Sequence, residues 1–350
     1  MPSTEYNTLL AVAEQVKLFI TPARQTFAEL PSGAVPLWSE EFFTWCYAKF
    51  NFQDFPAPIT YNKVLRALDE AAQSQPRQAI REISLRAATT KGGYEIDLGA
   101  TTIHLTGKQW KIKEGGSGLE PGSRFQRPAT SRPLPHPTHS EKPLEDHLRA
   151  AFGLKESSPK EDDPAKAFAQ WLELALRPDT HCPLLILTGE FRDEAAEAIR
   201  QLIDPASCAM LPFPTGRNEA GWMALYNRVL AFQIFGKITE FKRSIITELS
   251  RGIFQARLRQ TDHKGPKHYR QLGRPVIITA ETAPEIRGNQ IVVEIKKCGP
   301  LPQQEVLAAL FNQMVRSLRD EPKSKPVPTV IADTAPFPPI TNIQADVPCP

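Results

Sequence analysis

Four short apolar runs in the second half of the chain constrain its fold most strongly. They lie at residues 184–188, 227–235, 274–280 and 290–296, with longer stretches between them. Uninterrupted apolar runs are typical of strands buried on both faces, and parallel strands need a crossover, usually a helix, between them. The runs therefore predict a parallel α/β sheet that is covered by helices.

Amphipathic helices flank these runs. The period of apolar residues predicts helices at 144–152, 165–176 and 302–320. Together with the strands they predict a second domain over residues 144–320.

The first part of the chain carries a different pattern, with helices before strands. Helices are predicted at residues 4–19, 39–50 and 60–73. Between 79 and 113, apolar and polar residues alternate around glycines, which predicts a β-meander. Residues 1–113 are expected to form a small α+β domain. Its order of elements is that of a winged-helix DNA reader, although the acidic start and aromatic middle of 39–50 favour burial.

Proline marks the segments that join or follow these domains, because the 33 prolines are unevenly placed. Residues 114–143 are rich in Gly, Ser and Pro and predict an extended linker. Its basic residues are candidates for phosphate contacts, although a solvated linker is the simpler interpretation. They are Arg124, Arg127, Arg132, His136 and His139. The Pro-rich residues 321–350 are expected to be a disordered tail.

Composition argues against several classes of protein. The formal net charge of +3 does not by itself indicate nucleic-acid binding. The five cysteines are scattered and form no C-x-x-C pair, which argues against a disulfide framework and a zinc site. The histidines show no ligand-type grouping, so neither a metal nor another cofactor is expected. With no run of about 18 apolar residues and no signal peptide, a cytoplasmic protein without a membrane partner is expected.

The turn after the first apolar run raises the question of a nucleotide site. A P-loop places G-x-x-x-x-G-K-[S/T] between strand and helix, where backbone N–H groups and the Lys hold phosphates and the hydroxyl binds Mg²⁺. Here the strand is followed by Gly189, Glu190, Phe191 and Arg192. No second glycine, lysine, serine or threonine precedes the helix. Asp193 and Glu194 stabilise the helix start through its dipole and would repel a triphosphate.

The segments around this turn resemble a known family. They are Arg177-Pro178-Asp179, Thr188-Gly189-Glu190 and Leu202-Ile203-Asp204-Pro205. Their order and spacing are similar to those of primase-associated P-loop ATPases of phages and mobile elements, close to the superfamily-three and D5-like viral DNA helicases. Residues 95–112 and 124–137 add to the likeness, which extends over most of 9–320. The resemblance implies an AAA+-like P-loop domain.

The departures from the family pattern fall on the chemistry. The resemblance implies an acid and Asn after "VLAF", where this chain has Gln233 and Ile234, and an Asn sensor after "RPVII", where it has Thr279. The loop at Gly189 is shorter than a P-loop by roughly three residues. Phosphoryl transfer depends on positioned cations and charge stabilisation. The resemblance therefore implies a helicase-like fold without ATPase activity, a pseudo-ATPase.

A basic segment between the second and third apolar runs is the candidate nucleic-acid interface. The resemblance implies a hairpin here that reaches DNA, with "FQARLRQ" and "HYRQLGR" as its arms. Tyr269 can stack on a base, and basic side chains can contact phosphates. The candidate residues are Lys242, Arg243, Arg257, Arg259, His263, Lys264, Lys267, His268, Tyr269 and Arg270. An exposed basic loop that binds no DNA explains the same sequence.

Three functions remain open. The first is a catalytically inactive helicase-like protein of a phage or mobile genetic element, which binds single- or double-stranded DNA or a replication partner. The second is a protein–protein subunit that assembles with itself or caps an active helicase or primase paralogue, in replication or phage defence. The third is an active ATP-dependent helicase or primase-associated ATPase, which would need another nucleotide site.

Overall fold

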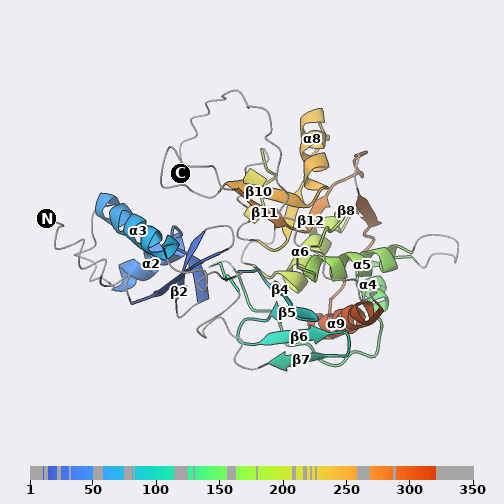
Figure 1. Cartoon of the computed structure of the whole chain (residues 1–350). Helices are drawn as coiled ribbons and strands as arrows, with labels where there is room; N and C mark the ends of the chain where they lie inside the picture. Colours follow the sequence, from blue (N-terminus) through green and yellow to red (C-terminus); the bar gives the residue numbers. More distant parts are fainter. Residues whose placement is uncertain are drawn as a thin grey trace.

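The computed structural model of the chain describes residues 11, 15–21, 25–30, 33–49, 58–74, 81, 83–113, 125–128, 131–155, 163–178, 180–206, 210–215, 219–220, 223–224, 227–257, 269–286 and 289–320. Figure 1 shows a first sheet with two helices on the left, an antiparallel meander below, and a helix-flanked sheet on the right. Among the described helices, none is long and apolar enough to span a membrane.

A three-stranded antiparallel sheet opens the fold, where the sequence predicted a helix up to residue 19 and no strand. Its strands are β1 (Lys17–Ile20), β2 (Thr26–Leu30) and β3 (Gly33–Pro36). The helix predicted over 4–19 is therefore wrong at its end, although Ala11 is helical. Phe19 pairs with Phe27 of β2 and their rings stack at 5.7 Å. This non-local pairing outweighs a helical pattern too short to be stable without packing.

Two helices cover this first sheet as the sequence predicted. They are α2 (Glu40–Lys49) and α3 (Pro58–Gln73). The Ser39 hydroxyl accepts a hydrogen bond from the Phe42 N–H at 3.2 Å, which caps the start of α2. Phe42 and Val64 are buried in a core shared with strands of the first sheet. The aromatic middle of α2 thus contributes to packing.

The predicted β-meander is present but packs on a distant helix. Its strands are β4 (Ala87–Thr90), β5 (Gly93–Asp97), β6 (Thr102–Thr106) and β7 (Trp110–Lys113), joined antiparallel in that order. Trp110 packs on Phe311 of α9 (Gln303–Asp320), and its indole N–H donates to the Asn312 side-chain oxygen at 2.9 Å. The winged-helix order expected for residues 1–113 stays a prediction, and in this structure α2 and α3 lie on another sheet than the meander. One hydrophobic core crosses the predicted domain boundary at 113.

The predicted parallel sheet forms from the four apolar runs. They become β8 (Leu184–Thr188), β9 (Leu230–Gln233), β12 (Val276–Thr279) and β13 (Gln290–Glu294). The sheet order is β13-β8-β12-β9, and each neighbouring pair is parallel. The predicted α/β fold with a parallel sheet is thus confirmed.

Helices bury both faces of the parallel sheet. On one face Leu185 and Ile277 share a core with α4, α5, α6 and α9. On the other, Ile186 and Ile278 share a core with Ile246 of α8. These helices are α4 (Leu144–Phe152), α5 (Pro164–Leu176), α6 (Arg192–Ile203) and α8 (Glu240–Leu249). Burial on both faces explains why the strands are continuously apolar.

The segment predicted as a solvated linker is packed where it is described. Phe125 and Leu134 are each 2% exposed. The Arg132 N–H donates to the Pro205 carbonyl at 2.9 Å, and the Thr138 N–H to the Gln304 carbonyl at 3.1 Å. Residues 132–143 form neither helix nor strand, but buried side chains and main-chain hydrogen bonds hold them against the rest of the protein. Residues 114–124 and the predicted tail 321–350 lie outside the described residues.

The two arms of the predicted basic hairpin pair with each other. They are β10 (Ile253–Arg257) and β11 (Tyr269–Gly273), which run antiparallel with Arg257 opposite Tyr269. The predicted tip, residues 261–268, lies outside the described residues. The hairpin is therefore confirmed as far as its arms.

Candidate functional site

The positions predicted for a degenerate nucleotide site meet at the carboxyl edge of the parallel sheet. In open α/β sheets, ligands bind outside this edge. Gln233 ends β9 and Thr279 ends β12, and the two are register partners. Thr279 is also the register partner of Leu187, which precedes the turn at Gly189. The fold therefore brings together the residues that the resemblance assigned to a nucleotide site.

The turn between β8 and α6 is short and tightly packed. β8 ends at Thr188 and α6 begins at Arg192. Gly189 has a φ of 94°, and a Cβ on it would lie 2.2 Å from the Ile295 carbonyl oxygen. The Arg192 guanidinium donates to the Gly189 carbonyl at 2.9 Å, closing the turn on itself. Glu190 is exposed and Phe191 packs on the main core.

A hydrogen bond links the start of α6 to the end of β9. The Gln233 amide N–H donates to the Asp193 carboxylate at 2.7 Å. An acid at position 233 would instead face Asp193 with a like charge. Asp193 also lies at the positive end of the α6 dipole, which stabilises its charge. The sequence analysis named both residues but did not predict their contact. The one indication of it in the sequence was Gln233, a neutral amide at a position where the resemblance implies an acid.

The two remaining predicted positions are buried. The Ile234 N–H donates to the Thr279 carbonyl at 3.0 Å, and the Ile234 side chain belongs to the α8-side core. Thr279 is fully buried, and among the described residues its hydroxyl has no hydrogen-bond partner. Thr279 is therefore enclosed by packing.

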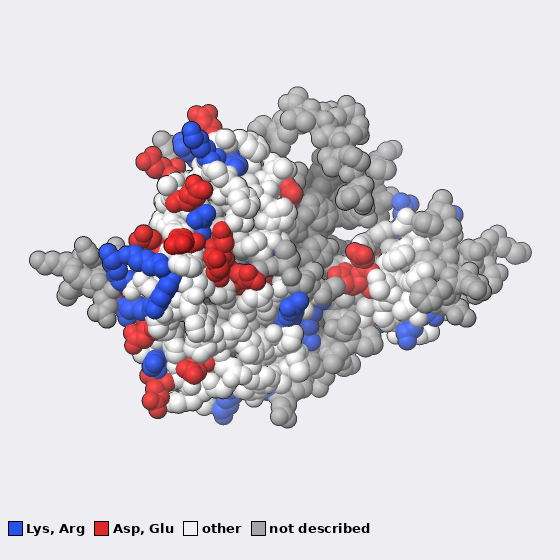
Figure 2. All heavy atoms as spheres, turned by 180° about the vertical axis from the view of Figure 1, so that it is seen from behind, with Lys and Arg blue, Asp and Glu red and all other residues white. Residues whose placement is uncertain are grey.

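Acidic side chains surround this edge. Exposed carboxylates follow or flank the ends of the strands, at Glu190, Glu194, Glu281, Glu285 and Glu294. Of these, Glu294 lies 3.7 Å from the Lys296 ammonium. Figure 2 shows the rear face, where acidic side chains gather beside a separate basic group at the left margin. The exposed Lys296 and Lys297 also follow β13, so this edge carries both charges, with carboxylates on the turn after β8 and on the loop after β12.

An open cleft of about 490 Å³ lies next to these strand ends. One wall is the loop that leads from β9 into α8, including Lys237, and Arg243 of α8. The other wall is the loop after β12, residues 280–285. The cleft therefore carries basic side chains on one wall and Glu281 and Glu285 on the other.

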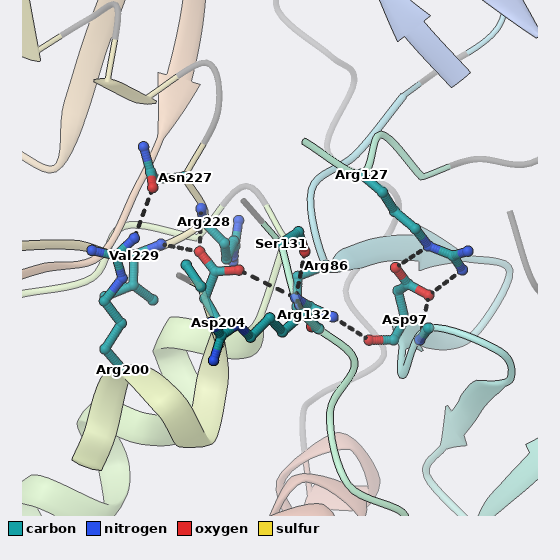
Figure 3. Close-up of polar contacts among 12 residues, drawn as sticks. Arg86, Asp97, Arg127, Ser131, Arg132, Arg200, Asp204, Asn227, Arg228 and Val229 are labelled. Atoms are coloured by element: carbon teal, nitrogen blue, oxygen red, sulfur yellow. Dashed lines mark hydrogen bonds and ion pairs between the residues drawn. The ribbon is translucent and has the colours of Figure 1, made fainter. Parts of the chain in front are cut away.

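The opposite, amino-terminal edge of the sheet contains a buried polar network that the sequence did not reveal (Figure 3). The Asp204 carboxylate accepts from the Arg228 N–H at 2.8 Å and the Val229 N–H at 3.2 Å. The Arg228 guanidinium donates to the Ala175 and Arg177 carbonyls. Asp204 and Arg177 belong to the family-like segments, and both serve here to join α5, α6 and β9.

The same network ties the meander and the extended segment to the sheet. Arg86 lies 3.5 Å from the Asp204 carboxylate and donates to the Asp97 carbonyl at 3.1 Å. It also donates to the Ser131 hydroxyl at 2.8 Å. The Arg127 guanidinium donates two hydrogen bonds, of 2.9 and 2.6 Å, to the Asp97 carboxylate. Arg127, a candidate phosphate contact by sequence, therefore has a structural partner.

The predicted nucleic-acid residues lie on two neighbouring elements. Lys242 and Arg243 lie in the first turn of α8, and the Lys242 ammonium donates to the Phe235 carbonyl at 3.0 Å. Arg257, Tyr269 and Arg270 lie on the hairpin arms. The other predicted residues, Arg259, His263, Lys264, Lys267 and His268, lie outside the described residues. Their role in binding DNA stays a prediction.

Metal ligands and thiols are the remaining side chains that could carry chemistry. Within the described ranges, no group of three or more His, Cys, Asp or Glu side chains could hold a metal. Burial raises the pKa of the Cys46 thiol to about 12 and also raises the pKa of Cys182. Both thiols are therefore protonated at neutral pH and poor nucleophiles.

No protein-family model and no curated protein matches this chain. Among solved structures, three apo structures of the NrS-1 C-terminal region are similar to it, with TM-scores of 0.40, 0.38 and 0.37 at 8, 10 and 8% identity. Each match covers 91% of this chain, and 69, 71 and 68% of the other. At these scores the likeness does not decide what this chain does.

Proposed function

We propose that this chain is a helicase-like protein of a phage or mobile genetic element that binds DNA without hydrolysing ATP. The proposal starts from the sequence resemblance and its missing catalytic residues. The observation that carries it is the Asp193–Gln233 hydrogen bond across the carboxyl edge, at 2.7 Å. Two side chains at the expected nucleotide site are thus engaged with each other.

The turn at Gly189 supports the absence of phosphate binding. A phosphate loop needs a backbone that curls with its N–H groups pointing at the ligand. Here the Gly189 α-carbon lies against the Ile295 backbone, and the Arg192 guanidinium binds the Gly189 carbonyl. Arg192 is a cation near the turn, and one of its N–H groups is used in this bond. The exposed Glu190 and Glu194 add repulsion toward a triphosphate.

The chemistry of phosphoryl transfer gives the same conclusion. Transfer requires a metal ion held by an acid and a residue that positions the attacking water. Gln233 is neutral and donates its amide hydrogen to Asp193. Thr279 is fully buried beside it. Neither side chain can take the role that the family gives to its position.

The hairpin and α8 support the DNA-binding part of the proposal. The arms predicted from the basic segment pair as β10 and β11, which directly follow α8 in the chain. Basic residues on adjacent elements can contact successive phosphates and give salt-dependent affinity. Lys242 and Arg243 are such residues on α8.

Two measurements test the proposal. Mg²⁺-ATP is expected to leave the thermal unfolding midpoint unchanged, whereas a ligand at 100 times its Kd adds about 2.7 kcal/mol of stability. Gel shifts with single- and double-stranded DNA are expected to show affinity that falls steeply with salt. Hydrolysis of ATP stimulated by DNA would refute the proposal. Absence of DNA binding at low salt would favour the capping or regulatory subunit instead.

A further inference from the structure

Two phenylalanines, Phe235 in the loop before α8 and Phe241 in its first turn, are unusually exposed. Phe235 is 71% exposed and Phe241 62% exposed, more than any other large apolar side chain in the described part of the chain. Single exposed apolar residues are ordinary on protein surfaces. Two such rings on one short segment, beside the open cleft, indicate a surface that is covered by a ligand or partner. Figure 1 shows α8 standing away from the body of the protein at the top of the view.

Cations lie on the same segment as the two rings. The Lys242 ammonium donates to the Phe235 carbonyl at 3.0 Å, which holds the positive charge next to that residue. Lys237 and Arg243 line the adjoining wall of the cleft. The Thr239 hydroxyl accepts from the Lys242 N–H and fixes the helix start. The positive end of the α8 dipole therefore adds to the attraction for anions.

Most acidic residues of the cleft lie on the wall that faces the basic α8 segment. On the α8 segment, Glu240 is the acid among Lys237, Lys242 and Arg243. Glu281 and Glu285 line the other wall. A polyanion is thus attracted to the α8 wall and repelled from the facing loop, which gives it one path along the segment.

We propose that residues 235–243 form a stacking site for an unpaired nucleic-acid strand. Bases stack on Phe235 and Phe241, while phosphates contact Lys237, Lys242 and Arg243. Aromatic rings accept only unpaired bases, because paired bases have no free face inside a duplex. The site rests on the DNA binding proposed above, and it names a single strand as the ligand.

The test uses the full chain, a fluorescein-labelled oligo-dT strand of about 16 nucleotides and a duplex of the same length. The double variant Phe235→Leu/Phe241→Leu keeps apolar surface and removes both rings. By anisotropy, it is expected to bind the strand about tenfold more weakly than the natural chain, with duplex affinity unchanged. Val292→Ala, which trims an exposed apolar side chain on β13, is the control and is expected to change neither affinity.

A second variant tests the phosphate contacts. Lys242→Ala/Arg243→Ala is expected to weaken strand binding and to flatten its dependence on salt, because two cations no longer displace counterions. Unfolding midpoints of all variants should match that of the natural chain, since the altered side chains lie at the surface.

The outcomes separate this inference from the proposed function. If the natural chain binds DNA and the leucine variant binds the strand equally well, the stacking site is refuted and DNA binding stands. If the natural chain binds neither strand nor duplex at low salt, both fail. If strand affinity is unchanged but the leucine variant loses self-association in sedimentation, the rings serve a protein contact and the inference is wrong.

Discussion

The two edges of the parallel sheet use acidic residues in opposite ways. At the amino-terminal edge, Asp204 accepts two main-chain N–H groups and pairs with Arg86. At the carboxyl edge, one carboxylate oxygen of Asp193 accepts from Gln233. The other oxygen is buried without a partner among the described residues. The amino-terminal edge is thus held by a charged pair and main-chain hydrogen bonds, whereas at the carboxyl edge Asp193 has one hydrogen bond, from the Gln233 amide.

The difference explains why the family-like segments can persist while the residues at the predicted nucleotide site differ from the family pattern. Asp204 and Arg177 belong to family-like segments, and both make buried contacts that hold α5, α6 and β9 together. Arg274, which begins the "RPVII" stretch, donates to the Ala224 carbonyl at 2.8 Å. These residues are needed for folding whether or not a nucleotide binds. The Gln233 side chain makes one hydrogen bond and the Thr279 hydroxyl makes none among the described residues, so these two positions can differ from the family pattern while the fold remains.

The largest effect is expected at the paired edge. Asp204→Ala leaves Arg86 without its carboxylate and two main-chain N–H groups without an acceptor. Breaking a buried charged pair destabilises proteins by about 3–5 kcal/mol. Chemical denaturation measures the loss in free energy of unfolding. Asp204→Asn, which keeps an oxygen acceptor, should lose clearly less; equal losses would mean that the charge of Asp204, and not its role as a hydrogen-bond acceptor, provides the stabilisation.

The turn at the other edge is expected to tolerate no side chain. Gly189→Ala places a Cβ 2.2 Å from the Ile295 carbonyl oxygen, at a φ of 94°. Backbone strain and forced displacement together predict a loss of about 2–4 kcal/mol in the free energy of unfolding. Gly236→Ala is the matched control, because Gly236 also has a positive φ but no atom within 4 Å of its added Cβ. A loss of only about 1 kcal/mol is expected there. Similar losses in both variants would show that the turn at Gly189 has room for a side chain.

The sequence predicted the parts of the fold that depend on local pattern. The apolar runs identified the parallel sheet because strands buried on both faces contain few polar residues. It missed β1, since the pairing of Phe19 with Phe27 is a tertiary contact that no local period encodes. It also missed that Leu134, in the segment predicted as a linker, is buried. Proline restricts the shape of the backbone but does not determine which part of the protein packs on it.

The candidate site was predicted residue by residue, but not as a set of contacts. The absence of a P-loop lysine and of an acid after β9 is visible in the sequence. Asp193 and Gln233 are 40 positions apart, so their hydrogen bond appears only when β9 and α6 are placed. The aromatic surface at Phe235 and Phe241 was missed for a similar reason, since an apolar residue beside a buried strand is expected to be buried too.

Restoring the acid at the end of β9 is expected to be unfavourable. Gln233→Asp replaces the donor to Asp193 with a second carboxylate, which should lower the free energy of unfolding by about 2 kcal/mol. Asp193→Asn combined with it should recover most of the loss, because the amide can donate to the new acid. A double-mutant cycle in denaturant measures this coupling. Additive losses would show that the two side chains do not interact.

The smallest effect is expected at Thr279, and its sign is informative. Thr279 is fully buried, and among the described residues its hydroxyl has no partner. Thr279→Val keeps the shape and removes a buried polar atom without a hydrogen bond, so the free energy of unfolding should rise by up to about 1 kcal/mol. Thr26→Val is the control: the buried Thr26 hydroxyl donates to Asp69 and accepts from Gln73, and its loss should destabilise by about 1 kcal/mol or more. If Thr279→Val proves as destabilising as Thr26→Val, the Thr279 hydroxyl makes a bond at the carboxyl edge, and that edge is less closed than the Asp193–Gln233 contact implies.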